Sequence, residues 1–503
     1  MKLKPSITLA LILLFFIPQM EIFPQNSAAL PRLVPDTKAL EYYGLGRRAG
    51  GYTWEELAEI ALWASGNAAS SNFASNLNRI KTMASNLNNS ADLPPQGKER
   101  AEFILTFLHR NVLRNYSLYQ TRIDGVLTNG SFNCVSSAVL YIILCESAGI
   151  RTSGVITRDH AFVIVHIEGE DIDVETTNRF GFDPGNRREF HDQFGRLTGF
   201  TYVPAQNYRD RQTISKIELI SLIMNNRIAD NDRASNFANS VPIAIDRAAL
   251  LFGESLIVNA EAYSSVFLFS DPRKDIMDRL INYGAFLLRA NREEEAIRWA
   301  EAASSMYPDV NRWGEYSLAA VNNRITRFVR DRRIADAKNF LENNKNIITE
   351  ESYLHLEIII IDADLLNRAN ASSTAEQGDA IINDIEQALK NGKTTSGRAA
   401  ELITYTVQRT AAALCAPPAR NWRAAINYIE AAATRFGENR ELEQALRTYR
   451  GNLATDYHNR FAAEWNRRNY DEAERILNEG LAEFPDNRQL LNNLETVNRH
   501  KAR

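Results

Sequence analysis

Cysteine is scarce in this chain, and neither sign of charge predominates. Three cysteines, Cys134, Cys145 and Cys415, occur among 503 residues. They are too few for a disulfide framework and lack the CxxC spacing of structural zinc sites. Lysine and arginine total 58 against 62 acidic residues, which gives a net charge of −4. Nucleic-acid-binding proteins normally carry a basic excess, so the composition argues against a nucleic-acid partner.

Long apolar runs are missing beyond the amino terminus. A membrane-spanning helix needs about 20 apolar residues, and no later stretch reaches that length. The first residues place Lys2 and Lys4 before eleven uncharged residues, Ile7 to Ile17, which is typical of a secretory signal. Small residues at 27–29 offer a cleavage site. We predict a signal peptide at residues 1–29 and an exported protein, periplasmic or secreted, with an uncleaved anchor as the alternative.

The rest of the chain has the composition of a folded protein with several domains. Hydrophobic residues make up 45% and charged residues 24%, close to the average for globular proteins. Residues 30–97 show a helical pattern, and Thr53 followed by Glu56 predicts a capping box at a helix start. A further helix is expected at residues 98–113. The first part of the mature chain is therefore predicted to be helical.

Residues 98–210 combine helical and strand signals. An apolar helix is expected from Cys134 to Ala148, because Gly149 is a normal helix stop. Alternating apolar and polar residues then predict a small antiparallel sheet. Its expected strands are residues 152–157, 160–167 and 172–176, the last two joined by a turn at Gly169. The segment is predicted to be an α+β domain, and the Gly- and Pro-rich residues 179–204 to form a loop over one side.

Helical hairpins are expected to fill the carboxy-terminal part, after a helical connector at residues 211–274. Similar patterns centre on Ala296, Ala337, Ala380, Ala425 and Ala473, which lie 41, 43, 45 and 48 residues apart. Small residues allow the two helices of a hairpin to approach closely. Residues 275–503 thus resemble tetratricopeptide repeats, although the interval is wider than the usual 34 residues of that family. The resemblance implies a solenoid with a protein-binding surface.

Cys134 is the first candidate for chemistry. It stands at the start of the predicted apolar helix, where unpaired backbone amides and the helix dipole favour a thiolate. The same amides can stabilise an oxyanion formed when the thiolate attacks a carbonyl. A cysteine alone is a weak signal, because free cysteines are most often small buried hydrophobic residues.

A histidine and two acids follow at suitable places. His160 opens a predicted strand 26 residues after Cys134, and histidine suits proton transfer near neutral pH. Asp173 and Glu175 lie on the next predicted strand and share a face, since they are two residues apart. Either carboxylate can hold the imidazole of His160 in the correct tautomer.

Together these elements resemble the transglutaminase-like superfamily, papain-like cysteine enzymes with a Cys-His-Asp triad on a helix and a sheet. The resemblance rests on the helix-start cysteine, on Asp159-His160-Ala161-Phe162 and on Val174-Glu175-Thr176-Thr177. It spans about residues 98–205 and implies Cys134 as nucleophile, His160 as base and Glu175 as orienting acid. Glutamate instead of aspartate, and Thr176 instead of proline, depart from the family pattern and leave Asp173 open as the third member.

Other polar residues near this segment have weaker claims. His166 shares a strand face with His160, but no HExxH or paired-cysteine spacing supports a metal site. Cys145 is expected to be a core residue and Cys415 a buried small residue near a helix end. Ser136 and Ser137 are expected to be polar groups of the first helical turn. A second oxyanion donor is expected before the nucleophile, and Asn133, Gln120 and Tyr116 are all available. Arg179 and Asp183 are candidates to line a substrate groove.

The sequence therefore predicts an exported cysteine peptidase, amidase or transglutaminase-type acyltransferase that acts on protein or peptide substrates. Its Cys-His-Glu triad is expected to work through a thioester and to need no cofactor or metal ion. The helical repeats are expected to bind a protein partner. Two alternatives remain: a catalytically silent domain in a repeat-based binding scaffold of the cell envelope, and a structural envelope protein that self-associates.

Overall fold

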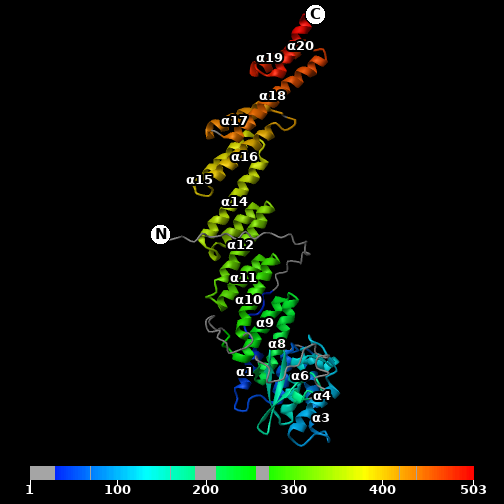
Figure 1. Cartoon of the computed structure of the whole chain (residues 1–503). Coiled ribbons are helices and arrows are strands. Elements are labelled where there is room, and N and C mark those ends of the chain that lie inside the picture. Colours follow the sequence, from blue (N-terminus) through cyan, green and yellow to red (C-terminus); the bar gives the residue numbers. More distant parts are fainter. Residues whose placement is uncertain are drawn as a thin grey trace, which may run out of the picture. The chain divides into compact units, whose positions relative to one another are not determined.

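The computed structural model divides into two units, Met1–Tyr283 and Gly284–Arg503 (Figure 1). It describes residues 29–67, 70–158, 160–186, 211–256, 271–418, 420–437 and 439–502. The predicted signal peptide lies outside these residues, apart from Ala29. Among the helices within these ranges, none combines the length and the apolar character that crossing a membrane requires.

The first unit begins with four helices. They are α1 (Thr37–Gly46), α2 (Trp54–Ala64), α3 (Phe73–Asn88) and α4 (Lys98–Asn111). The capping box predicted at the start of α2 is confirmed: Thr53 accepts from the backbone of Glu56, and the Glu56 side chain accepts from the backbone of Thr53. Because α2 packs against α6 and α8, its apolar face is buried.

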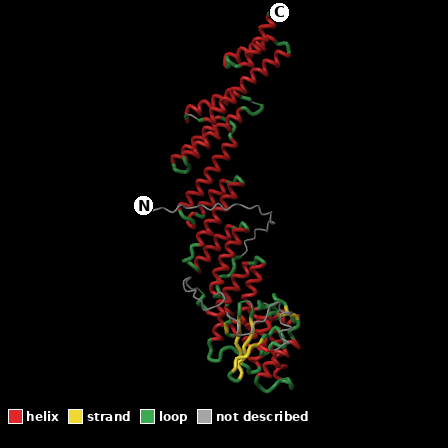
Figure 2. Tube along the Cα trace, in the orientation of Figure 1, coloured by secondary structure: helices red, strands yellow, loops and turns green. Residues whose placement is uncertain are grey.

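A small antiparallel sheet stands beside a buried helix. The strands are β3 (Arg151–Ile156), β4 (Ala161–Ile167), β5 (Glu170–Val174) and β6 (Gln212–Ile214), in the order β5-β4-β3-β6. Helix α6 (Cys134–Ser147) packs on β3 and β4, and Figure 2 shows the strands gathered at one place among the helices. Helix α6 and these strands form the core of this part, which is the predicted α+β arrangement of helix and sheet.

Two short strands and a short helix precede α6. Strands β1 (Asn115–Tyr116) and β2 (Ser131–Phe132) pair in parallel, with α5 (Ile123–Asn129) between them. Gly130 ends α5 in the left-handed conformation, with φ 74°, which glycine adopts without steric cost. A Cβ there would lie 2.9 Å from the carbonyl oxygen of Val112. The turn thus fixes where α6 begins.

Strand β5 ends two residues earlier than predicted. The backbone N–H of Glu175 donates to the carbonyl of Gly181 over 2.7 Å, so the chain turns back on itself instead of continuing the ladder with β4. A Cβ on Gly181 would lie 1.9 Å from the carbonyl oxygen of Glu175. The close approach of these two backbone segments therefore requires glycine, and it takes Glu175 out of the sheet.

Three further helices complete the first unit and lead into the second. They are α8 (Lys216–Arg233), α9 (Phe237–Phe252) and α10 (Pro272–Arg289). Helix α8 packs against α2, α6, α9 and β3. The segment predicted to be a helical connector thus lies directly against the helix that carries Cys134.

The described part of the second unit is entirely helical. Its α-helices are α11 (Glu293–Met306), α12 (Arg312–Arg330), α13 (Ile334–Asn343), α14 (Glu350–Ala371), α15 (Ala375–Lys390), α16 (Ser396–Leu414), α17 (Trp422–Phe436), α18 (Arg440–Asn466), α19 (Tyr470–Glu483) and α20 (Arg488–Lys501). Successive helices pack on each other, and separate apolar clusters follow one another along the chain. This stacking agrees with the predicted helical hairpins.

The alanines that marked the repeats are buried at four of five positions. Ala296, Ala337, Ala425 and Ala473 are at most 1% exposed. Ala380, in contrast, is exposed, so its prediction as the small residue of the third hairpin is wrong. Gly378 is the small residue at the close approach of this hairpin, because a Cβ at position 378 would lie only 2.2 Å from the hydroxyl of Tyr428.

Candidate functional site

Cys134 is the first residue of α6, as the sequence predicts. Asn133 caps the helix: its side-chain oxygen accepts from the backbone N–H of Ser136 over 3.0 Å, and the Ser136 hydroxyl accepts from the backbone N–H of Asn133 over 2.9 Å. Both groups are buried. The amides of a first helical turn have no carbonyl partner within the helix, so the thiol of Cys134 lies where negative charge is favoured.

His160 links Cys134 to a buried acid. Its Nε2 lies 2.5 Å from Oε2 of Glu175, and the side chain of Cys134 lies near enough to the ring to raise its pKa. Because Glu175 occupies Nε2, the nitrogen left to face the thiol is Nδ1. All three side chains are at most 9% exposed, so water screens these interactions little.

The environment of His160 favours its charged form. Burial acts to lower the pKa of the imidazole, but the carboxylate of Glu175 and the interactions with Cys134 outweigh it and hold this pKa well above its usual value. An imidazolium near neutral pH is the partner that a thiolate requires.

Glu175 is fixed by the residues that follow it. Its Oε1 accepts from the hydroxyl of Thr177 over 2.7 Å and from the backbone N–H of Thr177 over 3.2 Å. The hydroxyl of Thr176 lies 2.8 Å from that of Ser137 on α6. The segment that carries the acid is therefore tied through Thr176 to the helix that carries Cys134.

His109 holds the same segment from the other side. Its Nε2 lies 3.0 Å from the carbonyl oxygen of Thr176, and a carbonyl only accepts, so Nε2 carries the proton. Burial is the main cause that lowers the pKa of His109 to about 4. The ring is consequently neutral at physiological pH and serves as a donor.

Asp173, the alternative third member, lies elsewhere. Both of its carboxylate oxygens accept from Arg211, over 2.6 and 2.7 Å. Asp173 belongs to β5, opposite Ile164, whereas Glu175 lies beyond the end of that strand. Of the two acids, Glu175 is the one that meets His160.

Of the three oxyanion donors considered, Tyr116 has the most suitable surroundings. The amide of Asn133 donates to the carbonyl of Leu118 over 3.1 Å, and the side chain of Gln120 lies against Gly125. The hydroxyl of Tyr116 is buried and has no hydrogen-bond partner among the described residues. Burial raises the pKa of Tyr116, and the negative charges of Cys134 and Glu175 raise it further.

The remaining sequence candidates lie apart from this site. His166 contacts Ser153 and Asp171, over 2.9 and 2.7 Å, and no group of three potential metal ligands is found in the described parts of the chain. Cys145 is fully buried, as predicted, and burial raises the pKa of its thiol. Cys415 is only partly buried, so its prediction as a buried residue is wrong.

The two residues of the predicted loop that were candidates for a substrate groove lie outside the pocket beside Cys134. Arg179 stacks over Phe180, 4.5 Å from the ring centre, and neither Arg179 nor Asp183 is among the described residues that line the pocket beside Cys134. Residues 187–204 of the loop lie outside the described residues. Ser136 and Ser137 are hydrogen-bonded within the first turn of α6, as predicted.

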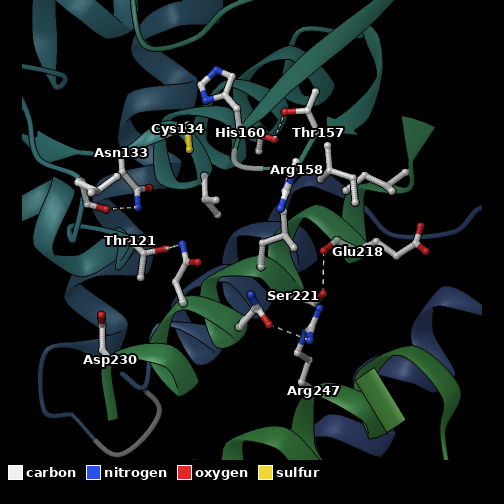
Figure 3. A pocket seen from close by; sticks show the side chains of 18 of the residues that line it. Thr121, Asn133, Cys134, Thr157, Arg158, His160, Glu218, Ser221, Asp230 and Arg247 are labelled. Carbon is white, nitrogen blue, oxygen red and sulfur yellow. Dashed lines mark hydrogen bonds between the residues drawn. The ribbon is translucent and has the colours of Figure 1, made fainter. Parts of the chain in front are cut away.

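A pocket of about 370 Å³ opens beside Cys134 and His160. In Figure 3 the thiol and the imidazole lie close together near one end, whereas Asp230 and Arg247 lie toward the other. One wall is a face of α8 that was not predicted from the sequence. The residues of this face recur at helical spacing, which is the sequence signal that could have revealed it. They are Glu218, Ser221, Leu222, Asn225 and Asn226.

The chain shows no match to any protein-family model and no similarity to a curated protein.

Proposed function

We propose that this protein is a transglutaminase-like cysteine enzyme that attacks amide carbonyls of protein or peptide substrates. The observation that carries the proposal is the buried series of Cys134, His160 and Glu175, with 2.5 Å between the imidazole and the carboxylate. The order of the three groups along the chain and the start of α6 at Cys134 support the resemblance to papain-like enzymes. The proposed enzyme is exported and needs no cofactor.

The reaction begins with a thiolate–imidazolium pair. Sγ of Cys134 attacks the carbonyl carbon, and the C–N bond breaks as His160 gives its Nδ1 proton to the leaving amine. Water then adds to the thioester while His160 accepts one of its protons. The C–S bond breaks, which releases the carboxylic acid and restores the thiolate. The side chain of Glu175 orients the ring and stabilises the imidazolium.

Two donors are assigned to the oxyanion of each tetrahedral intermediate. One is the backbone N–H of Cys134, in the first turn of α6. The other is the hydroxyl of Tyr116, which is buried, has no hydrogen-bond partner among the described residues and is influenced by the charge of Cys134. Donors that are already in place where charge develops lower the barrier most, because they need no reorganisation during the reaction.

The acyl acceptor decides the class of enzyme. Water gives a peptidase or amidase, and a lysine-type amine gives a transglutaminase. We propose hydrolysis as the reaction, because water is always present and needs no second binding site. The helical hairpins of the second unit are proposed to bind a protein or peptide, such as cell-envelope material.

Alkylation of Cys134 by iodoacetamide as a function of pH tests the proposal without a known substrate. We would use the Cys145→Ala, Cys415→Ala protein, with and without His160→Ala. Fast alkylation that persists below pH 7 and is lost with His160 is expected for a thiolate–imidazolium pair. Slow alkylation that rises only near the free-cysteine pKa of about 8.5, and is indifferent to His160, would instead favour a silent domain in a binding scaffold.

A further inference from the structure

Two adjacent apolar residues are exposed at the rim of the catalytic pocket. Leu118 is 51% exposed and Tyr119 is 64% exposed, and both line the pocket that contains Cys134. Single exposed apolar residues are common on protein surfaces. Here, however, two large neighbours in the chain face the same cavity as the nucleophile, and this position points to a ligand.

The backbone that carries them is held in place at several points. The N–H of Ser117 donates to the carbonyl of Phe132 over 2.8 Å, and the N–H of Gln120 donates to the carbonyl of Ser117 over 2.9 Å. The carbonyl of Leu118 accepts from the side chain of Asn133, the residue next to the nucleophile. These contacts join the rim to the start of α6, so the rim keeps a fixed distance from Cys134.

The ring of Tyr119 is also held by a contact with a charged side chain. The guanidinium of Arg233, on α8, lies 4.8 Å from the ring centre, within the range of a cation–π contact. Arg233 in turn pairs with Asp230 over 2.5 Å. An aromatic ring that is already held in place loses little conformational entropy when a ligand binds to it. The ring of Tyr119 can therefore bind a ligand at a small entropic cost.

We propose that Leu118 and Tyr119 form a specificity rim that binds a large apolar side chain of a polypeptide substrate, next to the amide that Cys134 attacks. The inference rests on the proposed function and names its substrate class. An amide group alone fills only part of a 370 Å³ pocket, and binding sites of this size normally enclose a larger ligand. Leu222 and Ile156, on other walls of the pocket, extend its apolar surface.

Two peptidyl chloromethyl ketones test the rim in the Cys145→Ala, Cys415→Ala protein. Acetyl-Phe-Gly and acetyl-Ser-Gly chloromethyl ketones differ only in the side chain offered to the rim. Their second-order rates of Cys134 labelling are compared with the rate for iodoacetamide, which is too small to reach it. We expect the phenylalanine probe to react at least tenfold faster than the serine probe, since burying an aromatic ring is strongly favourable.

The variant Leu118→Ser, Tyr119→Ser should bring the two ketone rates to within about twofold and leave the iodoacetamide rate unchanged. The matched control is Leu389→Ser, which replaces another exposed leucine, on α15, and should change none of the three rates. Fast iodoacetamide labelling with equal ketone rates in the unmutated rim would overturn this inference alone. Slow iodoacetamide labelling indifferent to His160 would overturn the proposed function and this inference with it.

Discussion

At the scale of single residues, the charge of His160 depends on its neighbours. Burial lowers the pKa of the ring, and Glu175 makes the largest contribution that raises it. Glu175→Gln keeps the shape of the side chain but removes its charge. The imidazole should then become neutral at pH 7, and the rate of Cys134 alkylation at pH 6 should fall by about 10- to 100-fold. Iodoacetamide labelling and the NMR titration of His160 measure both effects.

The same variant has an expected pH dependence of stability. Because the pKa of His160 is raised in the folded protein, the stabilisation from its proton is fully present below the unfolded value of about 6.5 and is lost as the pH rises through the folded value. The free energy of unfolding should therefore differ more between wild type and Glu175→Gln at pH 6 than at pH 9. Asp173→Asn, which affects the ion pair with Arg211, is the control and should alkylate at the wild-type rate.

Tyr116 is expected to act on acyl transfer and not on the thiol itself. Alkylation by iodoacetamide displaces iodide at a saturated carbon and forms no oxyanion, so Tyr116→Phe should leave its rate within about twofold. Acylation by p-nitrophenyl acetate passes through a tetrahedral oxyanion and should slow by about 10- to 1,000-fold. Equal losses in both reactions would show that Tyr116 only supports the fold around Cys134.

The sequence was informative about two members of the site and ambiguous about the third. The apolar run after Cys134 and the alternation after His160 identify a helix start and a strand start by local periodicity. The choice between Asp173 and Glu175 assumed that the strand continued to residue 176. It ends at Val174 because the chain turns back and Gly181 lies against the backbone of Glu175. The alternation of apolar and polar residues does not indicate where such a turn begins.

At the scale of elements, the turn after β5 is joined to α6 through one buried pair of hydroxyls. Thr176→Val removes the hydroxyl that contacts Ser137 and leaves that serine less satisfied, which typically costs about 1–3 kcal/mol. Because this turn also carries Glu175, we expect Cys134 alkylation at pH 6 to slow several-fold. Ser137→Ala should give a similar loss, and the double variant should lose little more, since both changes break one contact.

A buried threonine in the second unit separates positioning from general destabilisation. Thr406 is fully buried on α16, and its hydroxyl donates to the carbonyl of Leu402 over 2.7 Å. Thr406→Val should lower the free energy of unfolding without slowing alkylation. If Thr176→Val also changed only stability, the Ser137–Thr176 contact would be structural and would not position Glu175.

Gly378 tests the packing of the third hairpin. A Cβ at this position would lie 2.2 Å from the hydroxyl of Tyr428 and 2.7 Å from that of Thr410. Gly378→Ala should therefore destabilise the protein by about 1–3 kcal/mol, as measured by chemical denaturation. Gly451→Ala is the matched control: it lies within α18 with nothing within 4 Å of the added methyl group, and it should stabilise by about 0.5–1 kcal/mol. Equal effects of the two changes would contradict the close approach at Gly378.

The hairpins could be predicted because each depends on neighbours in the chain. Ala296 and Ala473 lie in strong local patterns, and both are buried. The third hairpin was misjudged, because alanine and glycine both satisfy a small-residue position and only the contact with Tyr428 distinguishes them. The contribution of α8 to the pocket could not be predicted either, because a helical pattern does not indicate which other element the helix will face.

At the scale of the whole molecule, the pocket beside Cys134 and the hairpins belong to different parts of the chain. Every described residue that lines the pocket lies between Leu118 and Pro272, within the first unit. In stacked hairpins each repeat is stabilised mainly by its neighbours, so removal of distant repeats should leave the first ones folded. The chemistry and the proposed partner binding should therefore be separable.

A chain that ends at Asp331 tests this separation. It keeps α11 and α12, whose Trp299 and Tyr316 pack beside Gly284 of α10, and it removes the later hairpins. We expect Cys134 alkylation at pH 6.5 to stay within about twofold of the full-length rate, while any protein captured through the repeats is lost. His160→Ala in the shortened chain is the control and should abolish the fast alkylation. If the shortened chain kept its helical circular dichroism but lost the fast alkylation, the later hairpins would be part of the catalytic unit, and the first unit would not be an enzyme by itself.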